Sequence, residues 1–330
     1  MRDASELSAA RRAARRIRPQ NAAVADDVWT SLNRPQKELS PKHFYDARGS
    51  ALFDEITGLV EYYPTRTERM LLRRWAPGWM RGIAPRTLIE LGPGSADKTR
   101  ILLDALSPGA SYVPVDISAT YLEEIARSIG ADYPRLCMLP ARSDISATLH
   151  VPAGLEHPAV FAFLGSTIGN FEMSSAVRLL RRVAQAMRVE DRFLMGADLK
   201  KDRDVLERAY NDSRGVTAEF NRNILRVVNR EAGTDFDVKA FDHLAYYDVA
   251  AERIEMHLVA RERQAVTVPG RGAIVFEPGE SVRTEISCKY DRERVAMLFG
   301  NAGLAVESWV TDDEGLYALA AGRLAGTTSS

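Results

Sequence analysis

Residues 86–109, RTLIELGPGSADKTRILLDALSPG, narrow the choice of folds more than any other stretch of the chain. A short apolar run is followed by a turn with two glycines, and an amphipathic helical pattern begins directly after that turn. This succession is typical of the first unit of a nucleotide-type parallel sheet. Gly92 and Gly94 let the backbone turn sharply and leave no side chain between it and a ligand. The segment therefore predicts an α/β fold.

The pattern of strand and helix recurs further along the chain. Apolar strand-like runs occur at 111–118, 159–171 and 191–202, and helical patterns at 119–129 and 174–187. This regular alternation indicates an open, doubly wound sheet that binds ligands at the carboxyl ends of its strands. Beyond Asp198 the pattern changes. Residues 204–229 are largely helical, and 252–268 and 281–290 alternate apolar and polar residues as antiparallel strands do.

The remaining segments complete a second, α+β lobe that we expect to bind substrate. Between the two alternating runs, residues 269–280 supply turn residues. A helix is expected at 291–302 and a closing pair of strands at 305–323. We expect a helical, partly disordered N-terminal segment (1–40) and a helical cap that contributes to the substrate lobe (41–82). A ligand-binding α/β domain (83–202) and a helical and antiparallel insertion (203–290) follow. The chain then completes the sheet (291–325) and ends in a disordered tail (326–330).

The charge balance argues against a polyanionic partner. Lys and Arg number 44 and Asp and Glu 45, so no overall field gathers nucleic acid or an anionic membrane. Residues 1–20 carry six arginines, five of them between residues 11 and 18, which we interpret as a frayed or solvated basic helix. No stretch approaches the roughly 18 apolar residues of a membrane span. We expect a small-molecule substrate and a monomer, without nucleic-acid or membrane partners.

The cysteines and histidines predict neither a disulfide framework nor a metal site. Cys137 and Cys288 are far apart, and neither belongs to a CxxC pair, which fits the reduced cytoplasm. The five histidines show no spacing typical of metal ligands.

The turn after the first strand indicates a cofactor site without a phosphate cradle. Only three residues separate Gly94 from Lys98, which is not the Walker spacing, and Asp97 stands where a dinucleotide fingerprint has its third glycine. Asp116 follows Gly92 by 24 residues, close to the interval at which an acid reaches ribose hydroxyls. These features alone leave S-adenosylmethionine (SAM), NAD and no cofactor as alternatives.

Asp144, in the segment ARSDIS after the third strand, has two interpretations. SAM enzymes often place an acid there to hold the adenine amino group, and an aspartate at such a position can equally cap the turn that follows it.

Seven blocks in the same order resemble the histidine-specific SAM-dependent methyltransferases, the histidine Nα-methyltransferases of ergothioneine biosynthesis. They are FYDARGSALFDEITGLVEYYPTRTE, ELGPGSADKT, YVPVDIS, FLGSTIGNF, AYNDSRGVTAEFNRNIL, IEMHLVA and RTEISCKY. The resemblance runs from about Phe44 to the C-terminal strands. It implies a Rossmann-like SAM-methyltransferase domain and the transfer of three methyl groups in succession to the α-amine of L-histidine, which gives hercynine. L-histidine and its mono- and dimethylated forms would then be the substrates, with SAM as co-substrate and no metal.

The resemblance also assigns site residues. It implies contacts with SAM for Gly92, Lys98, Asp116, Asp144 and Ile145. It implies substrate contacts for three groups of residues: those at the carboxylate and amine (Tyr62, Asn170, Tyr210), those at the imidazole (Glu285, Ser287), and the walls and further pocket residues (Phe220, Met256, Gly165, Tyr45). Asn170 and Tyr45 would act by positioning, and no general base is assigned.

The sequence departs from the family pattern at two positions. Pro93 stands where a small polar residue is expected, and Ser166 stands where a glycine is expected after Gly165. Pro93 stiffens the turn, and Ser166 could narrow the donor pocket. The competing interpretations are a relative that acts on a tryptophan derivative or another amino acid, an NAD-dependent oxidoreductase, and a non-catalytic protein that binds SAM or an amino acid.

Overall fold

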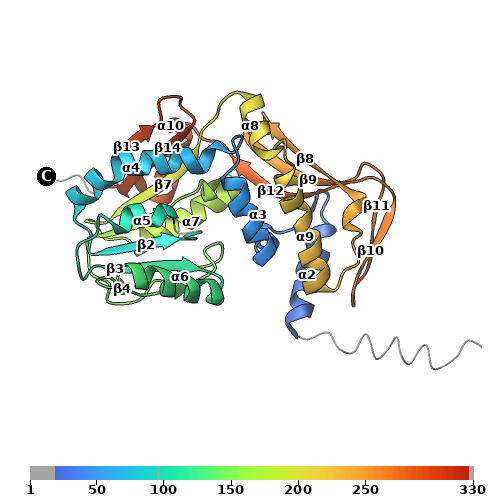
Figure 1. The fold of residues 1–330 in the computed structure, drawn as a ribbon, viewed down its shortest axis with the longest axis horizontal. Coiled ribbons are helices and arrows are strands. Elements are labelled where there is room, and N and C mark those ends of the chain that lie inside the picture. The colour runs from blue at the N-terminus through green and yellow to red at the C-terminus, as the bar shows by residue number, and fades with distance from the viewer. Residues whose placement is uncertain (1–18, 95–96, 327–330) are drawn as a thin grey trace, which may run out of the picture. The chain divides into compact units, whose positions relative to one another are not determined.

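The computed structural model describes residues 19–94 and 97–326 and divides the chain into two units (Figure 1). Unit 1 comprises the described residues up to Tyr62 together with Arg203–Asp248 and Ile254–Ile286. Unit 2 comprises Tyr63–Asp202, Val249–Arg253 and the described residues from Ser287 on. Residues 1–18 of the expected basic helix (1–20) and residues 327–330 of the expected tail (326–330) lie outside the described residues. Within the described ranges, no helix combines the length and apolarity that a membrane span requires.

Unit 2 contains the predicted doubly wound sheet. Its strand order is β13-β14-β7-β6-β2-β3-β4, and β5 also pairs with β3. The strands from β4 to β7 are parallel, whereas β14 pairs antiparallel with β7 and with β13. The bounds are β2 Thr87–Leu91, β3 Ser111–Asp116, β4 Cys137–Met138, β5 Ala141–Arg142, β6 Ala159–Phe163, β7 Arg192–Asp198, β13 Leu304–Thr311 and β14 Tyr317–Leu324.

The order of the strands creates a switch point in this sheet. After β2 the chain continues to β3 on one side, and β6 later pairs with the other side of β2. In open α/β sheets, ligands bind at the carboxyl ends of the strands that flank such a point. All residues of β2 and β6 are buried, as expected for central parallel strands covered on both faces.

Five α-helices accompany this sheet in the part of unit 2 that the structure describes: α4 Tyr63–Ile83, α5 Asp97–Leu103, α6 Ala119–Asp132, α7 Met173–Ala186 and α10 Arg292–Ala302. Helix α4 packs on α5 and β14, and α7 packs on α10. Helix α4 begins within the expected helical cap (41–82) and continues through Pro77. Leu71, Leu72, Ala76 and Met80 on its inner face are fully buried, and this burial offsets the backbone hydrogen bond that proline cannot make.

Unit 1 has a four-stranded sheet in the order β1-β12-β9-β8 and a separate antiparallel hairpin of β10 and β11. The strands are β1 Lys37–Glu38, β8 Phe241–Asp248, β9 Arg253–Ala260, β10 Gln264–Val268, β11 Gly272–Phe276 and β12 Ser281–Cys288. The helices are α2 Pro19–Leu32, η2 Pro41–Phe44, α3 Ala47–Thr57, α8 Arg203–Tyr210, α9 Val216–Ala232 and η4 Val238–Ala240. Helix α9 packs on α2 and α3.

The structure differs from the sequence-based expectations at several places. Residues 269–280 are not only turns, because β11 lies among them with Ile274 and Phe276 buried and Val275 exposed. The helical stretch after Asp202 is interrupted before α9, where Asp212 accepts hydrogen bonds from the backbone of Val216 and Thr217. β8 was not expected.

The division into units also differs from the expected segments. It falls between Tyr62 and Tyr63, so the expected cap of 41–82 is split: α3 packs within unit 1 and α4 within unit 2. A second division falls within β12, after Ile286, whereas the expected insertion ended at residue 290.

Candidate active site

The glycine turn after β2 is open above its backbone. Gly92 and Gly94 have φ angles of +62° and +53°, in the left-handed region that glycine adopts without strain. A Cβ at either position would meet no heavy atom within 4 Å. The N–H of Gly92 donates to the carbonyl of Val115 at 2.9 Å, which joins the turn to the end of β3. The turn therefore leaves space for a ligand to lie directly against its backbone.

Glu90, close before the turn, connects β2 to neighbouring elements through hydrogen bonds. Its buried carboxylate accepts hydrogen bonds from Thr99 of α5 at 2.7 Å and Tyr112 of β3 at 2.8 Å. Burial raises the pKa of Glu90 to about 7, although these two hydrogen bonds and the charge of Lys98 act in the opposite direction. Glu90 thus links β2 to its neighbouring strand and to the helix that follows the turn.

The acids predicted to hold the cofactor follow neighbouring strands at the same edge of the sheet. Asp116 ends β3, where it is half-buried and accepts a hydrogen bond from the N–H of Ser118 at 2.8 Å. Burial raises its pKa. Asp144 follows β5, is exposed, and accepts from the backbone and hydroxyl of Ser146. The capping role considered for Asp144 is therefore present, and Ile145 beside it is partly buried.

Lys98 is paired with a carboxylate that the sequence analysis did not single out. Glu68 of α4 is fully buried, and its Oε2 lies 2.5 Å from Lys98 Nζ. The same carboxylate accepts the backbone N–H of Gly165 at 2.8 Å and the hydroxyl of Tyr317 at 2.8 Å. Glu68 thereby joins α4, the first turn of α5 and the end of β6. The only sequence signal for this role was the position of Glu68 on the inner face of a helix.

Ser166 adopts a conformation that favours glycine. Its φ is +54°, and its buried hydroxyl accepts a hydrogen bond from the backbone N–H of Asp198 at 2.9 Å. The hydroxyl therefore supports the end of β7, which is a role that a glycine at this position could not perform.

Asn170 and Ser287 belong to segments that pack directly on each other within unit 2. Asn170 ends the short helix η3 Thr167–Asn170. At its neighbour Gly169, a Cβ would lie 2.9 Å from the carbonyl oxygen of Cys288 and 3.5 Å from the hydroxyl of Ser287. The close approach of η3 to the end of β12 thus requires glycine at this position.

A buried ionic cluster of Asp198, Lys201 and Lys289 contacts Ser287 through Lys289. It was not predicted from the sequence. Asp198 at the end of β7 accepts from Tyr63 at 2.7 Å and Lys201 at 2.6 Å. Its other oxygen lies 2.7 Å from Nζ of Lys289, which is fully buried and donates to the Ser287 hydroxyl at 2.8 Å. The available sequence signal for this cluster was Lys289, which lies between Cys288 and Tyr290 in the segment 281–290 that was expected to be a strand.

In unit 1, the predicted substrate residues form an aromatic cluster. Phe53 lies at its centre, with ring centroids 6.0 Å from Tyr45, 6.3 Å from Tyr62 and 6.0 Å from Phe220. Tyr62 in turn lies 6.2 Å from Tyr210. The structure therefore brings together four residues that are scattered over the sequence.

Tyr45 also lies close to the predicted imidazole-binding carboxylate. The protein around its hydroxyl raises the pKa of Tyr45, and the nearby Glu285 and Tyr210 raise it further. The residue is nevertheless 51% exposed to solvent, so a ligand can reach it. Glu285 on β12 is partly buried, and Met256 on the adjacent β9 is buried. The backbone carbonyl of Met256 accepts from Thr284 at 3.1 Å, which holds these two strands together beside Glu285.

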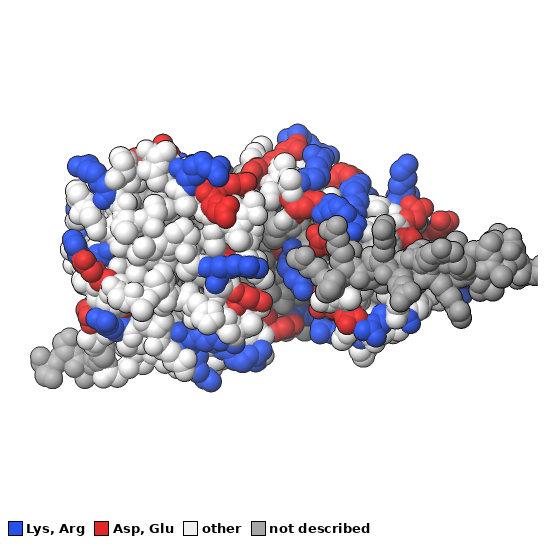
Figure 2. Space-filling model, turned by 90° about the horizontal axis from the view of Figure 1, so that it is seen from below, with Lys and Arg blue, Asp and Glu red and all other residues white. Residues whose placement is uncertain are grey.

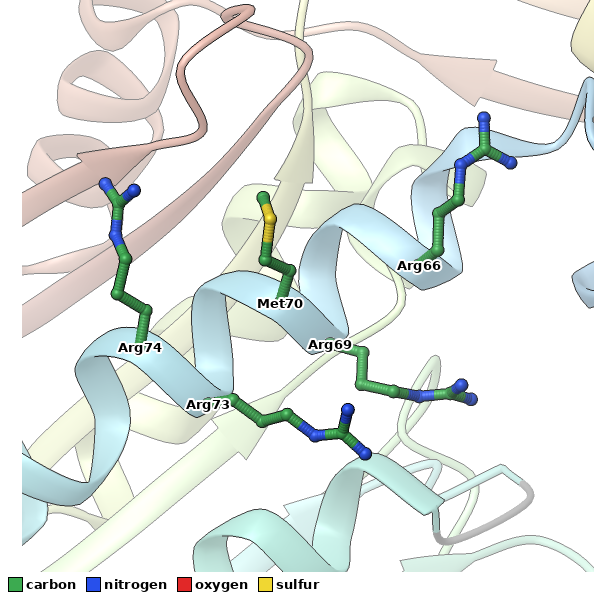
Figure 3. A pocket seen from close by; sticks show the side chains of 5 residues that line it. All are labelled: Arg66, Arg69, Met70, Arg73 and Arg74. Carbon is green, nitrogen blue, oxygen red and sulfur yellow. The ribbon is translucent and has the colours of Figure 1, made fainter.

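A separate surface hollow on α4 is lined by four arginines and one methionine and contains none of the predicted site residues. It is lined by Arg66, Arg69, Met70, Arg73 and Arg74, and Figure 3 shows Arg69 and Arg73 extending toward the ribbon of α5. Arg69 lies 3.4 Å from Asp97 and Arg74 lies 3.2 Å from Asp313, so part of this positive charge is paired. On the face shown in Figure 2, basic and acidic side chains are interspersed. Within the described ranges, no group of three or more His, Cys, Asp or Glu side chains could hold a metal ion.

The sheet and its carboxyl edge define the class of this protein. A switch point flanked by a glycine turn, with an acid after the neighbouring strand, is the architecture of an α/β domain that binds a nucleoside-containing ligand. A solved SAM-dependent methyltransferase from Clostridium acetobutylicum has a similar fold, with a TM-score of 0.50 and 12% sequence identity over 83% of this chain and 98% of that one. The chain belongs to the histidine-specific, SAM-dependent methyltransferase family, whose sequence model matches residues 24–324.

Two curated relatives place the chain within that family. It is 43% identical over 302 residues to the histidine N-alpha-methyltransferase of Mycobacterium tuberculosis, covering 90% of this chain and 94% of the relative. It is 31% identical over 313 residues to ergothioneine biosynthesis protein 1 of Neurospora crassa, covering 89% of this chain but 35% of that longer protein. The chain is therefore a SAM-dependent methyltransferase, and its relationship to the bacterial enzyme extends over nearly the whole length of both.

Proposed function

We propose that this enzyme transfers three methyl groups in succession from SAM to the α-amine of L-histidine, forming hercynine in the biosynthesis of ergothioneine. The observation that carries the proposal is the 43% identity to a histidine N-alpha-methyltransferase over 90% of the chain. Glu285 and Ser287, the pair that the resemblance assigns to the imidazole, are both present on β12.

The carboxyl edge of the sheet in unit 2 fits SAM. The open space above Gly92 and Gly94 allows a ligand to approach the backbone closely, and Asp116 can accept hydrogen bonds from ribose hydroxyls. In this proposal Asp144 and Ile145 border the adenine. Lys98 lines the site while Glu68 balances its charge.

The proposed substrate residues form two groups, one for the carboxylate and amine of histidine and one for its imidazole. Asn170 can donate to a carboxylate and accept from an amine with one amide, and Tyr62 and Tyr210 can donate to the carboxylate without adding charge. Glu285 and Ser287 are two residues apart in one strand, so their side chains point to the same side and can bind the two imidazole nitrogens. Met256 and Phe220 supply apolar walls, and Gly165 and Tyr45 complete the assignment.

Positioning is the main contribution of these residues to the reaction. SAM supplies an activated methyl group on a sulfonium. The residues that hold the amino acid must bring its nitrogen to near-attack distance in the correct direction, an effect that can supply several kcal/mol. The amine must be neutral at attack, and a cation close to it lowers the pKa of the corresponding ammonium. We assign no general base.

The proposal includes a simple cellular setting. Two free cysteines, one of them exposed, and a near-neutral charge are compatible with a cytoplasmic monomer that acts on small molecules.

The test is to incubate the enzyme with SAM and each of the twenty common amino acids and to analyse the products by mass spectrometry. We expect products with one, two and three added methyl groups from histidine. Methylation of tryptophan or another amino acid in preference to histidine would reassign the substrate, and binding without methyl transfer would make the chain a non-catalytic relative.

A further inference from the structure

One buried carboxylate at the carboxyl edge of the sheet in unit 2 is not assigned to any ligand in the proposed function. Glu68 of α4 is fully buried, and its Oε2 lies 2.5 Å from Nζ of Lys98, whose side chain is 19% exposed. The same carboxylate accepts the backbone N–H of Gly165, an exposed residue, at 2.8 Å. Glu68 therefore contacts two positions that the proposed function assigns to ligands, but it has no surface of its own that a ligand could touch.

Two strands of unit 2 hold this carboxylate in place. The Tyr317 hydroxyl of β14 donates to Oε1 of Glu68 at 2.8 Å. At Gly196 of β7, a Cβ would collide with Glu68 Oε1 and with the Tyr317 hydroxyl, so only glycine leaves the space that the carboxylate occupies. A carboxylate without access to water is tolerated only where it is paired and hydrogen-bonded. These partners therefore keep a negative charge next to Lys98.

Glu90 is a second acidic side chain close to this ion pair. Burial raises the pKa of Glu90 to about 7, and among the smaller influences the charge of Lys98 lowers this pKa while that of Glu68 raises it. Near neutral pH, Glu90 is therefore only about half ionised. Its carboxylate is hydrogen-bonded to Thr99 and Tyr112. Glu68, which contacts the Lys98 ammonium directly, is thus its main counter-charge.

The two forms of the cofactor, before and after transfer, differ by one charge. SAM carries a sulfonium, whereas the S-adenosylhomocysteine left after transfer of the methyl group has an uncharged sulfur. A Lys98 ammonium without a counter-charge would repel the sulfonium but not the uncharged sulfur. A carboxylate paired with Lys98 removes most of this repulsion, and salt screens a buried pair much less than an exposed one.

We propose that Glu68 determines how strongly the site binds SAM relative to S-adenosylhomocysteine, because its charge offsets that of Lys98 and so admits the sulfonium. This inference rests on the proposed function, because it takes from it the placement of SAM beside Lys98. Conversion of histidine to hercynine consumes three SAM molecules in succession, so SAM must replace S-adenosylhomocysteine during each conversion. A site with balanced local charge admits the cationic donor without an added electrostatic cost.

The test measures the Kd of SAM and the Kd of S-adenosylhomocysteine by calorimetry, using the full chain without histidine so that no transfer occurs. The readout is the ratio of the SAM value to the S-adenosylhomocysteine value, because a change that only loosens the site moves both together. In Glu68→Gln, which keeps the shape of the side chain and removes its charge, this ratio should rise about tenfold. A tenfold change is about 1.4 kcal/mol, which two unit charges reach at a separation of about 12 Å when the effective dielectric constant is about 20.

Further variants complete the comparison of charges. Lys98→Met leaves the Glu68 charge without its counter-charge and should lower the ratio about tenfold. Glu68→Gln combined with Lys98→Met removes both charges and should return the ratio to within about threefold of the wild type. If Glu68→Gln does not fold, Lys98→Met decides, and an unchanged ratio in that variant overturns the proposal.

The matched control is Tyr317→Phe. It removes a hydrogen bond to the Glu68 carboxylate but no charge, so its ratio should stay within about threefold of the wild type. A rise in Tyr317→Phe equal to that in Glu68→Gln would overturn the proposal, because displacement of the carboxylate would then explain the effect.

The outcomes separate this inference from the proposed function. Wild-type affinities for both ligands in every variant would show that SAM does not lie beside Lys98, which overturns the proposed placement and this inference together. Equal losses of affinity for both ligands in Glu68→Gln would leave SAM beside Lys98 and overturn only the role of the Glu68 charge. The substrate is tested separately, because methylation of an amino acid other than histidine would reassign the substrate without changing these ratios.

Discussion

Glu68 and Lys98, from two different helices of unit 2, form an ion pair of 2.5 Å directly beside the end of β6. The Glu68 carboxylate is fully buried and also binds the backbone of Gly165, so one side chain supports two of the predicted site positions.

Replacing Glu68 by glutamine should destabilise the protein and weaken SAM binding. The substitution leaves the Lys98 ammonium without its counter-charge, and breaking a buried pair in this way costs about 3–5 kcal/mol. We expect a loss of about 3 kcal/mol, because Lys98 keeps some access to solvent. The measurement is urea unfolding, with Glu90→Gln as the matched buried variant. An equal loss of stability in the two variants would show that the Glu68–Lys98 pair has no special role.

Glu90 should make stability depend on pH in an unusual direction. Its pKa in the folded protein is about 7 and thus above the ordinary value of 4.5, so the folded state binds the extra proton. Stability from this group is therefore present below about pH 4.5 and is lost as the pH rises toward 7, by about 3 kcal/mol in total. Glu90→Gln removes this dependence. The difference in unfolding free energy between wild type and variant, measured at pH 5 and at pH 7.5, tests the prediction, and a constant difference would contradict it.

Asp116→Ala should weaken SAM binding by about 1.5–3 kcal/mol, the range for hydrogen bonds to a charged group. Asp144→Ala should weaken SAM binding less, because its exposed carboxylate already accepts hydrogen bonds from Ser146. Calorimetry with SAM measures both variants. Unchanged affinity in a folded Asp116→Ala protein would remove this residue from the cofactor site.

Asn170→Ala should weaken histidine binding by about 1.5–3 kcal/mol, because it removes the hydrogen bonds of the Asn170 amide to the charged α-amino acid group. For the same reason, histamine, which lacks the carboxylate, should be a poor substrate of the wild type. The SAM affinity of the variant is the control and should not change. Equal turnover of histidine and histamine by the wild type would be inconsistent with this role.

Glu285→Ala should lower kcat/KM for histidine and reduce the preference over larger aromatic amino acids. A site that hydrogen-bonds its substrate can reject an analogue without those groups by about 10⁴-fold or more. Phenylalanine offers no N–H to Glu285 in the wild type, and the penalty for this missing hydrogen bond disappears in the variant. Adding Met256→Val enlarges the space beside β12 and should shift preference further toward indole. The experiment compares kcat/KM for histidine, phenylalanine and tryptophan, and constant ratios would show that Glu285 does not recognise the side chain.

Local patterns were sufficient to predict the doubly wound sheet and the glycine turn at its carboxyl edge. Apolar runs, the two glycines and the helical repeat after them are set by neighbouring residues, and β2, β3, β6 and β7 were found in the segments expected. β8 and β11 were not expected. The pattern of buried and exposed residues in β8 does not alternate regularly, and β11 is a short strand bounded by glycine- and proline-containing turns.

The buried charges could not be predicted in this way, because the partners that stabilise them are distant in the sequence. Glu68 meets Lys98 30 residues later, and Tyr63 meets Asp198 135 residues later. A charged side chain read alone is expected in solvent, since it is almost never buried without a partner. The folded chain supplies those partners. Chain order therefore indicates which residues follow the strands, whereas three-dimensional packing determines which charges become buried and which partners stabilise them.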